Sequence, residues 1–144
     1  MISVRKAIAK DINDIVQLLS SMGLNVEDIY TDKDYFVYYD NDVLLGCGMA
    51  FAVRDYCIID NILVDEKNRR NKIGTAIAKT IMNFYERNGA KIALSFGKCD
   101  AFFKSLGFSI WSDKDLPNFI KNILKKDLKQ IYAVSLEGYF KNCC

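Results

Sequence analysis

The sequence predicts a single α/β domain in which a mixed, mostly antiparallel central sheet carries helices on both faces. Three observations support this prediction. The chain has 144 residues, which is close to the usual size of one domain. Segments with strand periodicity and with helix periodicity follow one another in the order β-α-(α)-β-β-β-α-β-α-β-α-β. No Ser/Pro-rich linker or internal repeat divides the chain, so we expect one domain over residues 1–144.

The first half of the chain predicts a strand, a helix and then three consecutive strands. Ile2 and Val4 alternate with polar residues, as in a short strand. Apolar residues at helical spacing predict a helix that Asp11 caps and Gly23 ends. The acidic segment 24–33 predicts either a short helix or a loop. Residues 35–39, 43–53 and 56–64 are rich in aromatic and β-branched residues and are separated by turn signals, so they predict an antiparallel meander.

The second half predicts alternating helices and strands. Residues from Ile73 to Tyr85 share one helix face, and Gly89 marks the end of that helix. A strand over 91–96, a short helix over 100–106, a strand over 108–111, a helix after Pro117 and a strand over 131–136 follow. In the meander, Gly46 and Gly48 indicate tight packing or a bulge rather than a ligand contact.

The composition excludes several functional classes. Half of the residues are apolar (51%) and a quarter are charged (26%), which is typical of a globular protein. The chain has no histidine, which excludes Ser-His and Cys-His nucleophiles and His-ligated zinc. We expect no nucleic-acid partner at a net charge of +2, and no membrane segment, because no apolar run is long enough. No C-x-x-C pair occurs, so we expect no metal site and reduced thiols in a cytoplasmic protein, at Cys47, Cys57, Cys99, Cys143 and Cys144.

The strongest local signal is a strand that leads through a basic loop into the start of a helix. The first turn of a helix has unpaired N–H groups and the positive end of the helix dipole, so such a loop attracts phosphate. A solvated basic turn is the alternative interpretation. Neither a Walker nor a Rossmann glycine pattern is present. The strand residues are Ile62, Leu63 and Val64, and the loop and helix start comprise Arg69, Arg70, Asn71, Lys72, Ile73, Gly74 and Thr75.

These residues resemble the signature of the GNAT superfamily of acetyl-CoA-dependent N-acetyltransferases. That signature is a strand ending in hydrophobic-x-Val, followed by [Arg/Gln]-x-x-Gly-x-[Gly/Ala] at the start of a helix. Val64, Arg69, Ile73 and Gly74 match it, whereas Lys72 replaces the first glycine. A second block, residues 99–108, resembles the family segment A-x-x-F-[YF]-x-x-x-G-F. A few residues around 106–108 and 115–117 are also similar to the branch that contains N-acetylglutamate synthases.

The resemblance implies a fold, a donor and a reaction. It implies a GNAT-like sheet, with backbone amides from Arg69 to Thr75 on the pyrophosphate of acetyl-CoA and Ile62–Val64 along the pantetheine. Phe102 and Phe103 lie on the helix that flanks this arm. The implied reaction moves acetyl directly to a primary amine of a small molecule or peptide in a ternary complex. No metal is implied, and a homodimer is left open.

The sequence lacks the residues that often serve as general base and general acid in this family. Ile58 occupies the position where many members have a glutamate. The nearest carboxylate on the same strand face is Asp60, which could deprotonate the amine through water or be a structural residue. Phe103 replaces the tyrosine that often serves as general acid. The coenzyme A thiolate then leaves without help, or Cys99 or another tyrosine takes that role. Buried packing is the more frequent role for such a cysteine.

Two further interpretations concern the acceptor and the overall activity. Tyr30, Tyr35, Tyr38 and Tyr39 line an acceptor pocket or belong to the core. Acidic residues between Glu27 and Asp34 favour a cationic acceptor. The missing acid-base residues also keep a second hypothesis open, namely a catalytically weak or silent module that binds acyl-CoA.

Overall fold

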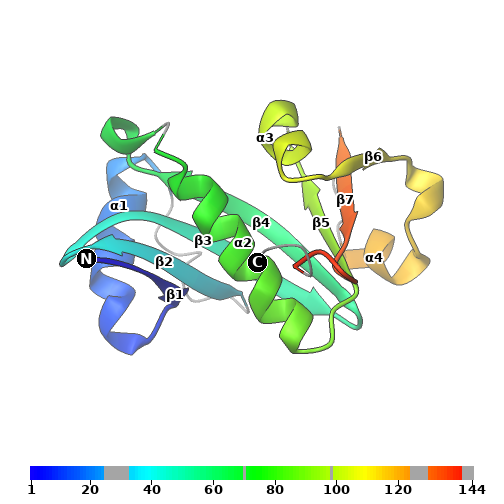
Figure 1. Ribbon diagram of the computed structural model, residues 1–144, viewed down its shortest axis with the longest axis horizontal. Helices are drawn as coiled ribbons and strands as arrows, with labels where there is room; N and C mark the ends of the chain where they lie inside the picture. Colours follow the sequence, from blue (N-terminus) through cyan, green and yellow to red (C-terminus); the bar gives the residue numbers. More distant parts are fainter. Residues whose placement is uncertain (25–32, 70, 98, 124–129, 141–144) are drawn as a thin grey trace. The chain divides into compact units, whose positions relative to one another are not determined.

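A computed structural model of the chain describes residues 1–24, 33–69, 71–97, 99–123 and 130–140. The predicted order of strands and helices is confirmed, with small differences at the ends. The predicted segment 24–33 lies mostly outside the described residues, as do Tyr30, Cys143 and Cys144. The strands and α-helices are β1 (Ile2–Lys6), α1 (Ile12–Ser21), β2 (Asp34–Asp40), β3 (Val43–Val53), β4 (Tyr56–Val64), α2 (Ile73–Arg87), β5 (Ile92–Phe96), α3 (Asp100–Ser105), β6 (Ser109–Trp111), α4 (Asn118–Ile123) and β7 (Ile131–Ser135) (Figure 1).

The seven strands form one mixed sheet in the order β1-β2-β3-β4-β5-β7-β6. The pairs β1/β2, β2/β3, β5/β7 and β6/β7 are antiparallel, and β4 pairs with β5 in parallel. The predicted mixed, mostly antiparallel sheet is therefore confirmed. Contacts divide the chain into two compact units, Met1–Phe51 with Asp60–Ile81, and Ala52–Ile59 with Met82–Cys144.

In the first unit, helices cover both faces of β2 and β3. Ile15, Leu18 and Leu19 of α1 pack against odd-numbered strand residues such as Cys47 and Met49. On the opposite face Gly46 and Gly48 lie beneath α2, which crosses in front of these strands in Figure 1. A Cβ atom on Gly48 would lie 2.7 Å from Cγ2 of Ile77 and 2.8 Å from Cδ1 of Ile81. These glycines therefore allow close helix packing, as predicted.

Asp11 does not cap α1, contrary to the sequence prediction. Its backbone is helical and its side chain makes no hydrogen bond to the first turn of α1. Instead Oδ2 of Asp11 accepts a hydrogen bond from the Ile8 amide at 2.8 Å, before the 3-10 turn Ala9–Asp11. The predicted stop at Gly23 is confirmed, because this residue has φ +73° in the left-handed region.

Among the described residues, no helix is long and apolar enough to cross a membrane. Cys47 is a buried free thiol and Cys99 is an exposed one.

Candidate active site

The strand that leads into the basic loop is fixed at its end by β3. The Asp65 amide donates to the carbonyl of Leu45 at 2.8 Å, immediately after the last residue of β4. The chain then makes a short 3-10 turn, Glu66–Asn68, in which the Asn68 amide donates to the carbonyl of Asp65 at 2.9 Å. The start of the loop is therefore held by backbone hydrogen bonds, before the chain reaches the positively charged residues.

Lys72 begins α2 in a conformation that favours glycine. Its φ is +58°, in the left-handed region, and its carbonyl accepts the hydrogen bond of the Ala76 amide at 3.1 Å. A side chain in this region costs about 1–2 kcal/mol. Lys72 therefore adopts a backbone conformation that a glycine reaches without strain, and adds a cation directly before α2.

The electrostatics of this loop suit an anion. Arg69, Asn71 and Lys72 are exposed, and α2 has no acidic residue in its first turn. Within the described part of the chain, neither Arg69 nor Lys72 makes a salt bridge, although Nε of Arg69 contacts the Val64 carbonyl at 3.4 Å. Ile73 is buried to 3% exposure and anchors the helix. Two cations and the free amides of the first turn thus lie close together in sequence and space. Arg70 lies outside the described residues.

The preceding strand has a segment that does not pair with β5. The parallel ladder runs from Tyr56↔Ile92 to Ile59↔Ser95 and ends before Ile62. At its end the buried Ser95 hydroxyl donates to the Ile59 carbonyl at 2.9 Å. Ile62, Leu63 and Val64 are half-buried. Because they lie beyond this ladder, their backbone is suited to bind an extended ligand as a strand would.

Asp60 lies just after the end of that ladder and is paired with a lysine. Nζ of Lys33 donates to Oδ2 of Asp60 at 2.7 Å, between side chains that are 30% and 40% exposed. Ile58 is only 1% exposed and belongs to the core. The carboxylate nearest to the family's glutamate position is therefore accessible, but it already holds an ammonium group.

Lys33 also lines a pocket. It has a volume of about 260 Å³, and most of its lining is apolar. Tyr35 contributes to its wall, whereas Tyr38 and Tyr39 are buried to 8% exposure and belong to the core. The full lining is Lys6, Ala7, Ile8, Ala9, Ile12, Ile15, Lys33, Asp34 and Tyr35.

In the second unit, α3 presents the second motif. Cys99 immediately precedes α3 and is exposed, so the predicted buried packing role is wrong. Phe102 is half-buried. Phe103 is 7% exposed and stacks on Tyr132, with ring centroids 5.0 Å apart and planes at 22°. Tyr132 donates a hydrogen bond to Asp100 at 3.3 Å, and burial raises the pKa of the Tyr132 hydroxyl.

The sequence profile of the acetyltransferase (GNAT) domain matches residues 31–110. This chain belongs to the GNAT acetyltransferase family. The match covers more than half of the chain and includes both β4 and the basic loop. The protein is therefore an acyltransferase.

Solved GNAT structures share the fold. A GNAT acetyltransferase from Staphylococcus aureus is 12% identical, with 94% of this chain and 99% of that chain covered and a TM-score of 0.74. The ribosomal-protein-S18-alanine N-acetyltransferase from Escherichia coli is 16% identical, with 94% of each chain covered and a TM-score of 0.72. N-acetylglutamate synthase from Neisseria gonorrhoeae is 20% identical, with a TM-score of 0.75, and the match covers 94% of this chain but 35% of that longer one. No curated protein matches the sequence.

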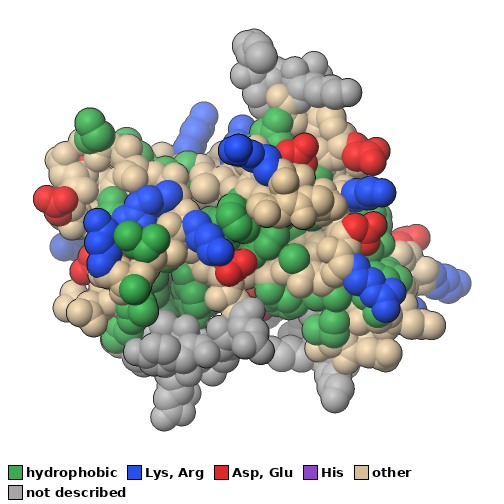
Figure 2. Space-filling view, turned by 90° about the horizontal axis from the view of Figure 1, so that it is seen from below, with side chains coloured by type: hydrophobic (Ala, Val, Ile, Leu, Met, Phe, Trp, Pro, Cys, Tyr) green, Lys and Arg blue, Asp and Glu red, His purple; other side chains and the backbone are tan. Residues whose placement is uncertain are grey.

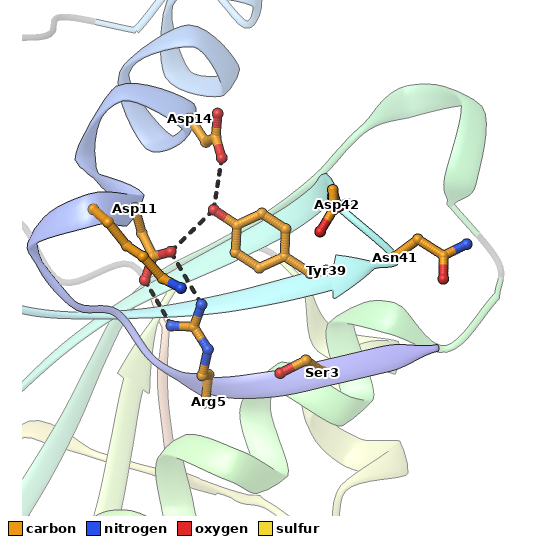
Figure 3. A pocket seen from close by; sticks show the side chains of 8 residues that line it. Ser3, Arg5, Asp11, Asp14, Tyr39, Asn41 and Asp42 are labelled. Carbon is orange, nitrogen blue, oxygen red and sulfur yellow. Dashed lines mark hydrogen bonds and ion pairs between the residues drawn. The ribbon is translucent and has the colours of Figure 1, made fainter.

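This GNAT chain contains one polar cluster that sequence reasoning missed. Arg5 binds both carboxylate oxygens of Asp11, at 2.6 and 3.0 Å (Figure 3). The Tyr39 hydroxyl lies 3.2 Å from Oδ1 of Asp11 and 2.8 Å from Oδ2 of Asp14. Arg5 and the Ile8 amide lower the pKa of the buried Asp11 to about 2. Because Arg5 and Asp11 satisfy each other, we assign this cluster to the stability of the first unit.

Proposed function

We propose that this enzyme moves an acetyl group from acetyl-CoA to a primary amine of a small molecule or peptide, by direct attack in a ternary complex. The observation that carries the proposal is the loop at the start of α2, where exposed Arg69 and Lys72 have no acidic partner among the described residues. A pyrophosphate supplies the negative charge that such a loop lacks.

The residues present fit the donor. The amides around Gly74 and the two cations would bind the pyrophosphate. The segment Ile62–Val64, which does not pair with β5, would bind the pantetheine through the backbone groups on that side. Of the two phenylalanines that the resemblance assigns to this arm, Phe102 is half-buried and Phe103 is buried, so Phe102 is the more accessible. The Neisseria gonorrhoeae structure was determined with coenzyme A and N-acetyl-glutamate, which supports the same donor here.

Direct transfer suits the side chains of this protein. A thioester is already activated, so no enzyme nucleophile is needed, and backbone donors can stabilise the oxygen on which negative charge develops. Asp60 would accept the proton of the incoming ammonium once Lys33 has moved from it. Phe103 cannot donate a proton, and the coenzyme A thiolate would leave without that help.

Donor binding can be tested by thermal unfolding with acetyl-CoA. At about 100 times Kd a ligand stabilises the folded state by about 2.7 kcal/mol, a shift of about 5–10 °C for a chain of this size. Gly74→Glu places a carboxylate beside the phosphates and should abolish the shift. Asn83→Glu adds the same charge at an exposed position further along α2 and should keep it. No shift of the unsubstituted protein at millimolar acetyl-CoA would reject the proposed donor.

A silent acyl-CoA-binding module is the second candidate. It is favoured by Ile58 and Phe103, which are buried and stand where the family often has its base and acid. The ion pair of Lys33 with Asp60 favours it as well. Release of free thiol from acetyl-CoA across a panel of primary amines separates the two candidates. Sustained turnover with any amine rejects the silent module, whereas a thermal shift without turnover supports it.

The proposal also includes a cytoplasmic location and an acceptor that is not a nucleic acid. Cys47 and Cys99 are free thiols, which supports a reducing cytoplasmic environment. Figure 2 shows basic and acidic side chains interspersed with apolar ones on one face. A mixed surface of this kind supports an amine acceptor rather than a nucleic acid.

A further inference from the structure

We propose that the enzyme acetylates its own Lys33, an inference that rests on the proposed acetyl transfer. Nζ of Lys33 donates to the candidate base Asp60 at 2.7 Å, which is the contact that an acceptor amine must make before it loses its proton. Lys33 directly precedes β2, and Asp60 lies in β4 just before the segment proposed to bind the pantetheine. The protein therefore holds a primary amine of its own on the candidate base.

Two other lysine–aspartate pairs among the described residues provide an internal comparison. Nζ of Lys6 lies 3.4 Å from Asp34, and Nζ of Lys104 lies 3.0 Å from Asp100. Neither aspartate belongs to β4. The side chains of Lys6 and Lys104 are 46% and 55% exposed, whereas that of Lys33 is 30% exposed. Non-enzymatic acetylation favours accessible amines, so it should label Lys6 and Lys104 before Lys33.

The reaction balances without any further reactant. The ammonium of Lys33 gives one proton to Asp60, and the free amine attacks the thioester carbon of acetyl-CoA. A bond forms between Nζ and the carbonyl carbon, and the bond between that carbon and sulfur breaks. The amide nitrogen loses its second proton, one proton ends on the coenzyme A thiolate, and the other goes to solvent. The products are acetyl-Lys33, coenzyme A and H⁺.

Acetylation also changes the site. An acetylated lysine has no positive charge, so it no longer forms an ion pair with Asp60. The carboxylate is then available to an external amine, and Lys33 itself lines the pocket of about 260 Å³. Self-acetylation at Lys33 would therefore remove a competing ammonium group from the base.

Peptide mass spectrometry of the full chain incubated with acetyl-CoA tests the proposal. We expect an added acetyl group on Lys33 ahead of Lys6 and Lys104, with a rate that does not depend on protein concentration. Asp60→Asn should lower the rate at Lys33 by about 100-fold, near the lower end of what a positioned base contributes. Asp60→Glu, which keeps a carboxylate, should restore part of it. Labelling of Lys6 and Lys104 should be the same in all three proteins, and an equal Tm shows that the variants are folded.

Two results would overturn the proposal: Lys33 is labelled no faster than Lys6 and Lys104, or Asp60→Asn leaves its rate unchanged. The amine panel keeps this failure separate from failure of the proposed function. Thiol release with external amines while Lys33 stays unlabelled rejects self-acetylation alone. If neither the amines nor Lys33 are acetylated, the transferase proposal fails with it.

Discussion

Asparagine in place of Asp11 should destabilise the protein in a pH-dependent way. The Asp11 side chain is 3% exposed, and it binds the Arg5 guanidinium through both oxygens and accepts from the Ile8 amide. These contacts join β1, the following 3-10 turn and, through the Tyr39 hydroxyl, β2. Asparagine has a similar size but no charge, so the substitution removes the ion pair and leaves the Arg5 guanidinium without its carboxylate.

The magnitude follows from the pKa of Asp11, which the fold lowers from 3.8 to about 2. A pKa that is depressed in the folded state contributes stability above the unfolded value, and this stability is lost as pH falls through the folded value. A shift of about 1.8 units corresponds to about 2.4 kcal/mol at pH 7. The same linkage relation gives about 1.3 kcal/mol at pH 3 and about 0.4 kcal/mol at pH 2.

Urea unfolding of the two proteins between pH 7 and pH 3 measures this difference. Other carboxylates titrate in both proteins, so the difference in the free energy of unfolding isolates Asp11. Asp42→Asn is the matched control. Asp42 and Asp11 both line a pocket beside Arg5 and Tyr39, but Asp42 is exposed, so its effect should be small at every pH (Figure 3). If the destabilisation by Asp11→Asn is equal at pH 7 and pH 3, the ionised pair with Arg5 is not its source.

Two further substitutions test the packing and the loop. Gly48→Ala should lower the free energy of unfolding by about 1–3 kcal/mol, because the new Cβ would lie 2.7 and 2.8 Å from two buried isoleucines of α2. An unchanged Tm would contradict this prediction and show that α2 can move away from β3. Lys72→Gly should raise the free energy of unfolding by up to about 1 kcal/mol. It removes the backbone strain of a side chain at φ +58°, but it also makes the unfolded chain more flexible. A lower Tm in calorimetry would show that Lys72 is not strained.

The sequence was sufficient for the order of elements because the periodic signals are local. Apolar spacing marked α1 and α2, and positive φ values at Gly23, Gly89 and Gly107 confirm the predicted helix ends. The packing role of Gly46 and Gly48 was also predictable, because a glycine in a buried strand leaves room for a neighbouring element. The positively charged loop was found from the residue types around Gly74.

The long-range polar contacts could not be predicted from the sequence. Asp11 stands where a capping residue is expected, yet Arg5 and Tyr39, from two strands, fix its side chain elsewhere. Lys33 and Asp60 are 27 residues apart, and their pairing depends on how β2 and β4 are placed in the sheet. The exposure of Cys99 likewise depends on how α3 packs. Periodicity carries no information on such contacts, because they join residues from separate elements.

The absence of histidine excludes fewer mechanisms for this enzyme than it would for most hydrolases. Imidazole is needed to activate a serine or cysteine nucleophile, but an amine that attacks a thioester needs only to lose its proton. In this protein one accessible carboxylate, Asp60, lies near the predicted donor strand, and a lysine is bound to it. The pair is accessible enough that an incoming ammonium can replace Lys33 at small energetic cost. In the proposed mechanism, Lys33 and an external amine would therefore compete for Asp60.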